Sequence, residues 1–183
     1  YLGVNRECLG RLEVSASKLA LVLLDGFGCN LFEAIGLKEK FECITTVFPS
    51  STATVITTLF TALTPGEHGI LGFSNFSKAL GTIVNPLRFS TPYNGSRDSL
   101  KDYFSFLKVY PNVKSYLQEV NKDKKTAEVL PKGIEQTEFT LATHGRTNVT
   151  RTYVSLWDAF QEASNIMGEG YDFVYIYVPD VDT

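Results

Sequence analysis

The feature that most constrains the fold is a six-residue apolar run, LALVLL at Leu19–Leu24, which ends in Asp25-Gly26. A continuous apolar run, rather than an alternating one, is typical of a strand that is buried on both faces of a parallel sheet covered by helices. The run is far too short to span a bilayer, so the sequence predicts no membrane segment in this chain. Asp25 is then expected at the carboxyl end of a strand.

The rest of the chain alternates between strand-like and helix-like segments, which predicts an α/β fold with a mostly parallel sheet flanked by helices. The expected strands lie at 41–47, 126–130 and 173–178, and the expected helices at 30–37, 52–63, 112–120 and 153–166. In the last of these helices, Leu156, Trp157, Phe160 and Ala163 are expected to face inward. Residues 73–111 lose this periodicity, which predicts a loop excursion near a substrate site.

Composition excludes one class of partner and leaves others open. The formal net charge of −3 provides no basic excess, so binding of nucleic acid by a basic surface is not expected. Cys8, Cys29 and Cys43 are odd in number and lack the paired spacing of a zinc site, which favours buried thiols in a reducing, cytoplasmic compartment. Composition leaves the oligomeric state open.

A hydroxyl-rich stretch, FPSSTATVITTLFTALTPGEHGILG at residues 48–72, places Thr52 near the start of a predicted helix. Ligands of open α/β sheets collect at the carboxyl ends of strands, where helix N-termini offer free N–H groups. Asp25 and Asp182 each follow a predicted strand. Carboxylates suit a divalent cation and a helix N-terminus suits an anion, so these residues together suggest a phosphoryl group held by metal.

Each of these residues also has an ordinary structural interpretation. Asp25-Gly26 fits a simple turn, Thr52 fits a helix N-cap, and Asp182 fits a loop carboxylate. His68 and His144 have no second ligand at helical spacing, so they are interpreted as loop or hydrogen-bonding histidines rather than metal ligands. On the residues alone, both interpretations of the three candidate residues stay open.

The order of the motifs resembles the alkaline phosphatase superfamily, and within it the type I phosphodiesterase/nucleotide pyrophosphatase family. The resemblance rests on the apolar strand with LLDGFG, the 48–72 stretch and the late YVPDVDT segment, so it covers nearly the whole chain. It implies an alkaline phosphatase-like catalytic domain of which residues 1–183 are the N-terminal part, incomplete at the C-terminus.

The resemblance also implies roles for individual residues. Asp25 matches the family's first metal-binding aspartate, Thr52 the nucleophilic and metal-binding threonine, and Asp182 the aspartate of a D-x-x-x-H motif, with Asp180 as the less favoured choice. The histidine of that motif would lie four residues after Asp182, beyond this chain, as would a later Asp-His pair and a final histidine. The implied cofactors are two divalent metal ions, most simply Zn²⁺.

One departure from the family's pattern concerns substrate choice. Nucleotide-cleaving members have a phosphate-contacting asparagine soon after the HGI segment, and here that position is Phe73, with Asn75 two residues later as the substitute. The implied reaction is hydrolysis of a small-molecule phosphate ester or nucleotide through a phosphothreonine. Alternatives are a phosphomonoesterase, a phosphonoacetate hydrolase or a sulfatase on the same fold, or a non-catalytic binding module derived from it.

Overall fold

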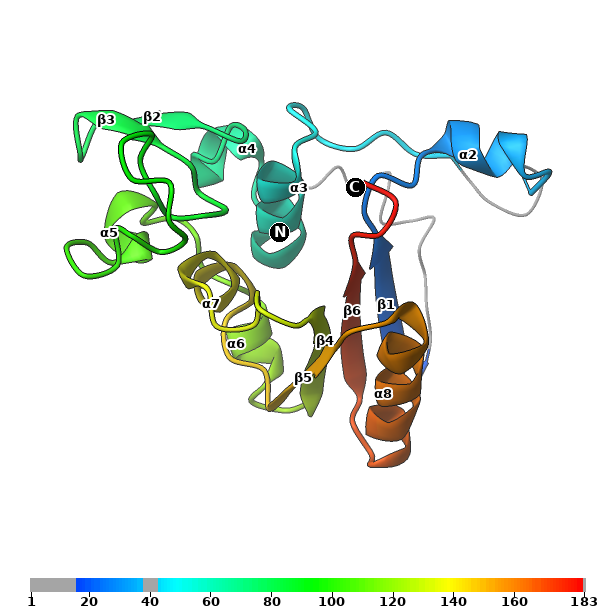
Figure 1. The fold of residues 1–183 in the computed structure, drawn as a ribbon. Coiled ribbons are helices and arrows are strands. Elements are labelled where there is room, and N and C mark those ends of the chain that lie inside the picture. Colours follow the sequence, from blue (N-terminus) through cyan, green and yellow to red (C-terminus); the bar gives the residue numbers. More distant parts are fainter. Residues whose placement is uncertain (1–15, 38–42, 183) are drawn as a thin grey trace.

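The structure is a computed structural model that describes residues 16–37 and 43–182. Its main sheet has four parallel strands in the order β1 (Leu19–Leu24), β6 (Phe173–Val178), β4 (Thr126–Pro131) and β5 (Val149–Tyr153) (Figure 1). β1 and β6 pair in register from Leu19 with Phe173 to Leu24 with Val178. The predicted α/β fold with a mostly parallel sheet is confirmed.

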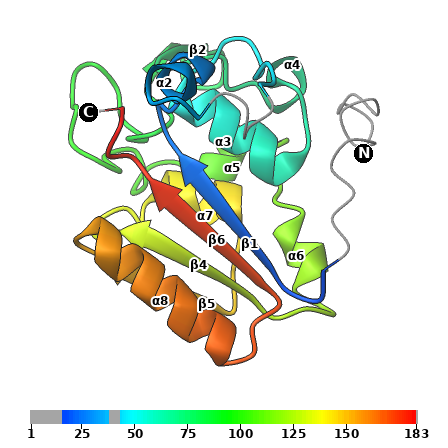
Figure 2. The ribbon, with the colours of Figure 1, turned by 90° about the vertical axis from the view of Figure 1, so that its right-hand side faces the viewer.

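Helices cover both faces of this sheet, and β6 shows how the sequence arranges it. Val174, Ile176 and Val178 belong to a core cluster that includes Ala159, Ala163 and Ile166 of α8 (Leu156–Gly168). Tyr175 and Tyr177 point the other way, into a larger cluster with residues of α3 (Thr52–Thr61) and α7 (Glu138–His144). Successive side chains of a strand alternate between faces, so β6 separates two cores. Figure 2 shows α8 on one side of the sheet and α3 and α7 on the other.

The remaining helices are short: α2 (Cys29–Ala34), α4 (Pro65–His68), α5 (Phe106–Val109) and α6 (Leu117–Val120). No helix among the described residues is long and apolar enough to cross a membrane. β1 departs from the prediction of burial on both faces, because Leu19, Val22 and Leu24 are exposed while Leu21 and Leu23 pack against the larger core. The reason is its place at the edge of the described sheet, since α8 packs on β4, β5 and β6.

Several predicted elements are wrong in their extent. Residues 43–47 form no strand, and residues 41–42 lie outside the described residues. The helix expected at 112–120 is limited to α6, while α7 was not predicted. The helix expected from residue 153 begins at Leu156, since β5 occupies residues up to Tyr153 and Ser155 caps the helix through a capping box with Asp158.

The expected inward face of α8 is confirmed at Ala163 and is wrong at Leu156, Trp157 and Phe160. Its buried residues are Ala159, Ala163 and Ile166, whereas Trp157 is 85 % exposed and Leu156 and Phe160 are each 43 % exposed. The small side chains at 159 and 163 allow the helix to approach the sheet closely, and Leu156, Trp157 and Phe160 lie toward its other faces. Size at the contact, rather than hydrophobicity alone, selects the buried face.

The segment 73–111 contains a hairpin of β2 (Asn75–Ser77) and β3 (Thr82–Val84), followed by turns and α5. It is anchored by its own apolar residues, since Val84, Phe89 and Phe106 are almost fully buried in the larger core. In Figure 1 this segment extends from α4 to α7 on the side of the sheet that carries α3. Aromatic packing between Phe89 and Phe106, whose ring centroids lie 5.1 Å apart, stabilises it.

Two of the cysteines correct the prediction of buried thiols. Cys29 and Cys43 are exposed and form a disulfide across 14 residues of sequence, and Cys8 lies outside the described residues. Disulfides persist in oxidising environments, so cysteine usage no longer favours a reducing compartment.

His68 is a buried structural histidine. Its Nδ1 atom accepts a hydrogen bond from the Ile70 N–H at 3.1 Å, so the neutral ring carries its proton on Nε2 and donates to Thr58 Oγ1 at 3.0 Å. This agrees with its interpretation as a hydrogen-bonding histidine.

Burial lowers the pKa of His68 to about 4 from an ordinary value near 6.5. The unfolded chain therefore binds more protons between these values, and the stability that neutral His68 contributes is complete above pH 6.5 and is lost as the pH falls toward 4. We expect the free energy of unfolding of the parent protein to decrease when the pH is lowered from 7.5 to 4.5. This decrease should be larger by about 2 to 3 kcal/mol than the decrease in His68→Gln, which lacks the titrating ring. Urea unfolding at both pH values measures this, and equal pH dependence in the two proteins would contradict it.

Candidate active site

Asp25 lies where β1 ends, held by a hydrogen bond from its backbone N–H to the Val178 carbonyl at 2.9 Å. The next residue, Gly26, has a φ of +74°, a conformation that glycine adopts at no steric cost. A Cβ atom at Gly26 would lie 2.9 Å from Cα of Asp182, so only glycine allows the two strand ends to approach this closely. The backbone therefore brings Asp182 beside Asp25.

Thr52 is the first residue of α3, directly after the N-cap residue Ser51. The first hydrogen bond of the helix runs from the Val55 N–H to the Ser51 carbonyl, so the preceding N–H groups have no acceptor within the helix. Ser51 forms no side-chain cap, and its hydroxyl is paired with Thr54 at 2.9 Å. The Thr52 hydroxyl does not cap the helix. Instead it donates a hydrogen bond to Asp25 Oδ2 at 3.0 Å.

Tyr177 completes this group, and the sequence analysis assigned it no role. Its hydroxyl donates to the same Asp25 Oδ2 atom at 2.7 Å, and its backbone carbonyl accepts a hydrogen bond from the Tyr153 hydroxyl at 2.7 Å. Burial first, and then the hydrogen bond to Asp25, raise the pKa of Tyr177 far above its ordinary value, to which the negative charge of Asp182 also contributes. Tyr177 is therefore a permanent hydrogen-bond donor to Asp25.

Of the predicted site residues Asp25, Thr52, Asp182 and Asn75, only the first three lie near one another. The structure joins Asp25 and Thr52 directly and places the backbone of Asp182, whose side chain is exposed, against Gly26. Asn75 is occupied elsewhere: its Oδ1 accepts the Leu71 N–H at 2.8 Å and its amide donates to the Gly72 carbonyl at 3.1 Å, so it closes the turn before β2. Its predicted contact with substrate remains a prediction.

The chemistry of this group fits part of a metal site. Asp25 and Thr52 present a carboxylate and a hydroxyl oxygen to the same half-buried position, and oxygen donors suit divalent cations. Within residues 16–37 and 43–182, no three His, Cys, Asp or Glu side chains gather in a way that could hold an ion. The described residues therefore offer some of the ligands for a metal ion, with Asp182 close by.

A small pocket lies beside Thr52 and continues between α3, α7 and β6. Its lining residues are Thr52, Ile56, Leu87, Arg97, Ile134, Thr137, Phe139, Thr140, His144 and Tyr177. A larger open pocket of about 440 Å³ lies on the 73–95 segment and includes Phe73 and Arg88. The first of these two pockets is the one that contains the candidate nucleophile.

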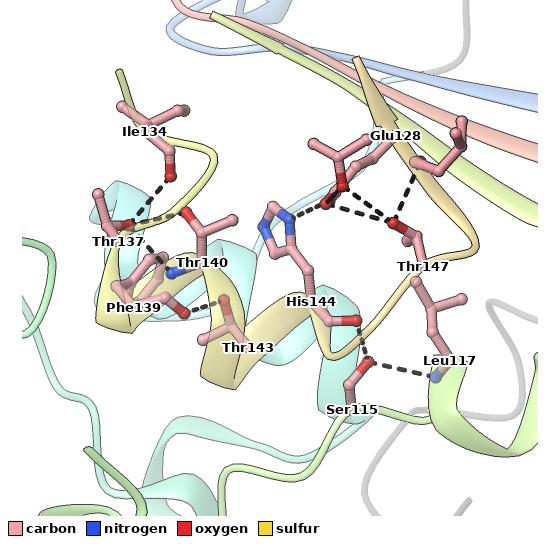
Figure 3. Close-up of polar contacts among 12 residues, drawn as sticks. Ser115, Leu117, Glu128, Ile134, Thr137, Phe139, Thr140, Thr143, His144 and Thr147 are labelled. Carbon is pink, nitrogen blue, oxygen red and sulfur yellow. Dashed lines mark hydrogen bonds and ion pairs between the residues drawn. The ribbon is translucent and has the colours of Figure 1, made fainter. Parts of the chain in front are cut away.

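Behind this pocket lies a buried polar pair that the sequence analysis did not identify. His144 Nδ1 lies 2.8 Å from Glu128 Oε2, and their side chains are 3 % and 5 % exposed (Figure 3). Glu128 Oε1 also accepts the Thr150 hydroxyl at 2.7 Å. The imidazole stacks on Phe60 of α3 with ring centroids 4.1 Å apart. The sequence signal was a single carboxylate in a strand, TAEVLP, that has no other charged residue, because a buried charge requires a partner.

Comparison with known proteins shows which family the chain belongs to. The family model described as type I phosphodiesterase / nucleotide pyrophosphatase matches residues 19–183. A search of curated proteins finds none that matches the chain. The matched range contains both strand ends, Thr52 and the pocket beside it, and it confirms the resemblance of the motifs. The chain therefore belongs to the type I phosphodiesterase/nucleotide pyrophosphatase family.

Proposed function

We propose that this protein hydrolyses phosphate esters, as a phosphodiesterase or nucleotide pyrophosphatase, with Thr52 as the nucleophile. The observation that carries the proposal is the hydrogen bond of 3.0 Å from the Thr52 hydroxyl to Asp25 Oδ2 at the start of α3. A threonine that capped the helix would instead accept an N–H of its own helix. Membership of the family supports hydrolysis of phosphate esters as the general reaction.

The described residues suit each part of this reaction. Thr52 Oγ1 would attack phosphorus, the P–O bond to the leaving alcohol or phosphate would break, and water would then hydrolyse the phosphothreonine. The proton that Thr52 must lose already lies in a hydrogen bond to Asp25. The N–H groups of the first turn of α3 have no acceptor within the helix, so they can stabilise negative charge on the phosphoryl oxygens.

The family is generally metal-dependent. In our proposal Asp25, Thr52 and Asp182 would hold two divalent ions, most simply Zn²⁺, together with ligands that residues 16–37 and 43–182 do not supply. Such ions would supply positive charge that favours ionisation of the Thr52 hydroxyl and balances the charge of the phosphoryl group.

The test uses the full-length protein with zinc and compares hydrolysis of bis-p-nitrophenyl phosphate with that of p-nitrophenyl phosphate. We expect preferential turnover of the diester that is lost with a chelator and restored by added metal. Preference for the monoester would move the protein to phosphomonoesterase activity with the same nucleophile. Turnover of neither ester by the metal-loaded protein would contradict the proposal.

Tyr177→Phe tests whether the hydrogen bond from the Tyr177 hydroxyl orients the Asp25 carboxylate for the reaction. The variant keeps the ring but removes one of the two hydrogen bonds to Asp25 Oδ2, so the carboxylate loses orientation. We expect kcat for the diester to fall about 10-fold with little change in KM, as for the loss of one hydrogen bond to a charged group. Steady-state kinetics measure this, with Tyr153→Phe as a control that removes a hydrogen bond to the Tyr177 backbone. An unchanged kcat in Tyr177→Phe would show that Asp25 needs no such support.

A further inference from the structure

We propose that the open pocket on the 73–95 segment is a second ligand site, which binds a small organic carboxylate through Arg88 and an apolar wall. The class of ligand is a single carboxylate on an aromatic or aliphatic body. The inference does not depend on hydrolysis by Thr52, because no residue that lines this pocket also lines the pocket beside Thr52. In Figure 1 the β2–β3 hairpin lies beyond α4 from α3, so the two sites are apart.

The size and lining of this pocket suit a whole small molecule. Its volume is about 440 Å³, and ligand pockets in proteins have volumes of roughly 300–1,000 Å³. Such pockets combine mostly apolar walls with a few polar groups that fix the orientation of the ligand. Here Phe73, Ile83 and Pro92 are apolar, and Arg88 is the one charged residue among the described residues of the lining. The pocket therefore matches a ligand with an apolar body and one negative charge.

The apolar wall of the pocket is open to water. Phe73 is 66 % exposed and Ile83, on β3, is 45 % exposed, although both are large apolar side chains. A ligand body that covers them removes apolar surface from water, which is favourable. An aromatic body can also stack on the ring of Phe73. The wall consequently favours ligands that carry a ring or a branched chain over a carboxylate without one.

Arg88 supplies the charge. Its Nη1 atom donates to the Gly95 carbonyl at 3.2 Å, and both residues line the pocket, so this hydrogen bond holds the side chain along the wall. Among the described residues Arg88 has no carboxylate partner, in contrast to Arg151, which pairs with Glu162 and Glu169. A guanidinium has several further N–H donors in a planar arrangement that matches the two oxygens of a carboxylate. One guanidinium balances one negative charge, which favours a carboxylate over a doubly charged phosphate.

The backbone that carries Arg88 is held in place. Asn85 and Ser90 exchange two backbone hydrogen bonds of 2.9 and 3.3 Å, and Asn85 Oδ1 accepts the Arg88 N–H at 2.9 Å. Phe89 is fully buried and has a φ of +42°, a conformation that a residue with a side chain keeps only where its surroundings fix it. A charged side chain on a fixed turn is preorganised for a ligand, because little backbone entropy is lost on binding.

The test is titration calorimetry of the full-length protein with 2-naphthoate, 2-naphthamide and acetate. The amide keeps the ring and the planar shape without the charge, and acetate keeps the charge without the ring. We expect 2-naphthoate to bind more tightly than either of the other two. Arg88→Met should lower the affinity ratio of 2-naphthoate over 2-naphthamide about fivefold or more, and Arg88→Lys should lower it less. Phe73→Ala should weaken both aromatic probes about equally and leave that ratio unchanged.

Arg97→Met and Phe76→Ala are the matched controls. Arg97 is an exposed cation that lines the other pocket, and Phe76 is 66 % exposed like Phe73 but does not line this pocket. No binding of 2-naphthoate, equal affinity for 2-naphthoate and 2-naphthamide, or equal effects of a variant and its control would overturn the site. The readout is binding rather than turnover of a phosphate ester, so the ligand site and the proposed function stand or fall separately.

Discussion

Thr52→Ala in the full-length, metal-loaded protein is expected to lower kcat for bis-p-nitrophenyl phosphate on the order of 10³-fold or more, while the protein remains folded. The physical reason is that alanine lacks the hydroxyl that Asp25 Oδ2 orients at the start of α3, which is the attacking group in the proposed reaction. Loss of a nucleophile that forms a covalent intermediate has effects of this size or larger. The side chain is only half-buried, so removal of its hydroxyl and methyl groups leaves the core intact.

The measurement combines steady-state kinetics with circular dichroism and zinc analysis of each variant. Ser51→Ala is the matched control, because Ser51 is the adjacent hydroxyl and is paired with Thr54 rather than with Asp25. We expect this control to stay within about threefold of the parent, and Thr52→Ser to retain part of the activity because its hydroxyl can attack. Turnover retained by folded, metal-loaded Thr52→Ala would exclude Thr52 as the nucleophile.

The sequence predicted the parts of the site that depend on local pattern. A continuous apolar run followed by Asp25-Gly26 placed the carboxylate at a strand end, and helical spacing after Ser51 placed Thr52 at a helix start. In a parallel sheet the carboxyl ends of strands lie at one edge, so these local assignments were enough to bring Asp25 near Thr52. Their catalytic and metal-binding roles stay predictions that the variants above test.

The sequence could not predict the partners that come from long-range packing. Tyr177 is 152 residues from Asp25, and a tyrosine within FVYIYV is typical of an ordinary core position. Arg97 lies in a segment without periodicity, so no pattern indicated that it would reach the pocket of Thr52. Trp157 is an error of a different kind, because its hydrophobicity predicted burial and the structure exposes it. The face of α8 that packs on the sheet instead carries the small residues Ala159 and Ala163.

His144→Ala is expected to lower the free energy of unfolding by about 3 to 5 kcal/mol, the largest stability effect that we predict for one substitution. Truncation leaves the carboxylate of Glu128 buried without its imidazole partner, although Thr150 still donates to it. Removal of one member of a buried pair costs far more than the pair itself contributes, because the remaining charge cannot reach water. The substitution also removes the stacking of the ring on Phe60 in the helix that carries Thr52.

Urea unfolding followed by circular dichroism measures this loss as a shift of the midpoint, with Lys122→Ala as the control. Lys122 and Glu119 form an ion pair whose side chains are 65 % and 75 % exposed, so its removal should change stability by less than about 1 kcal/mol. Glu128→Gln combined with His144→Ala should cost less than the sum of the single variants, because the double variant leaves no uncompensated charge. A loss in His144→Ala as small as that in Lys122→Ala would mean that Glu128 is not held as a buried carboxylate. The anchoring of α3 through Phe60 would then have to depend on apolar packing alone.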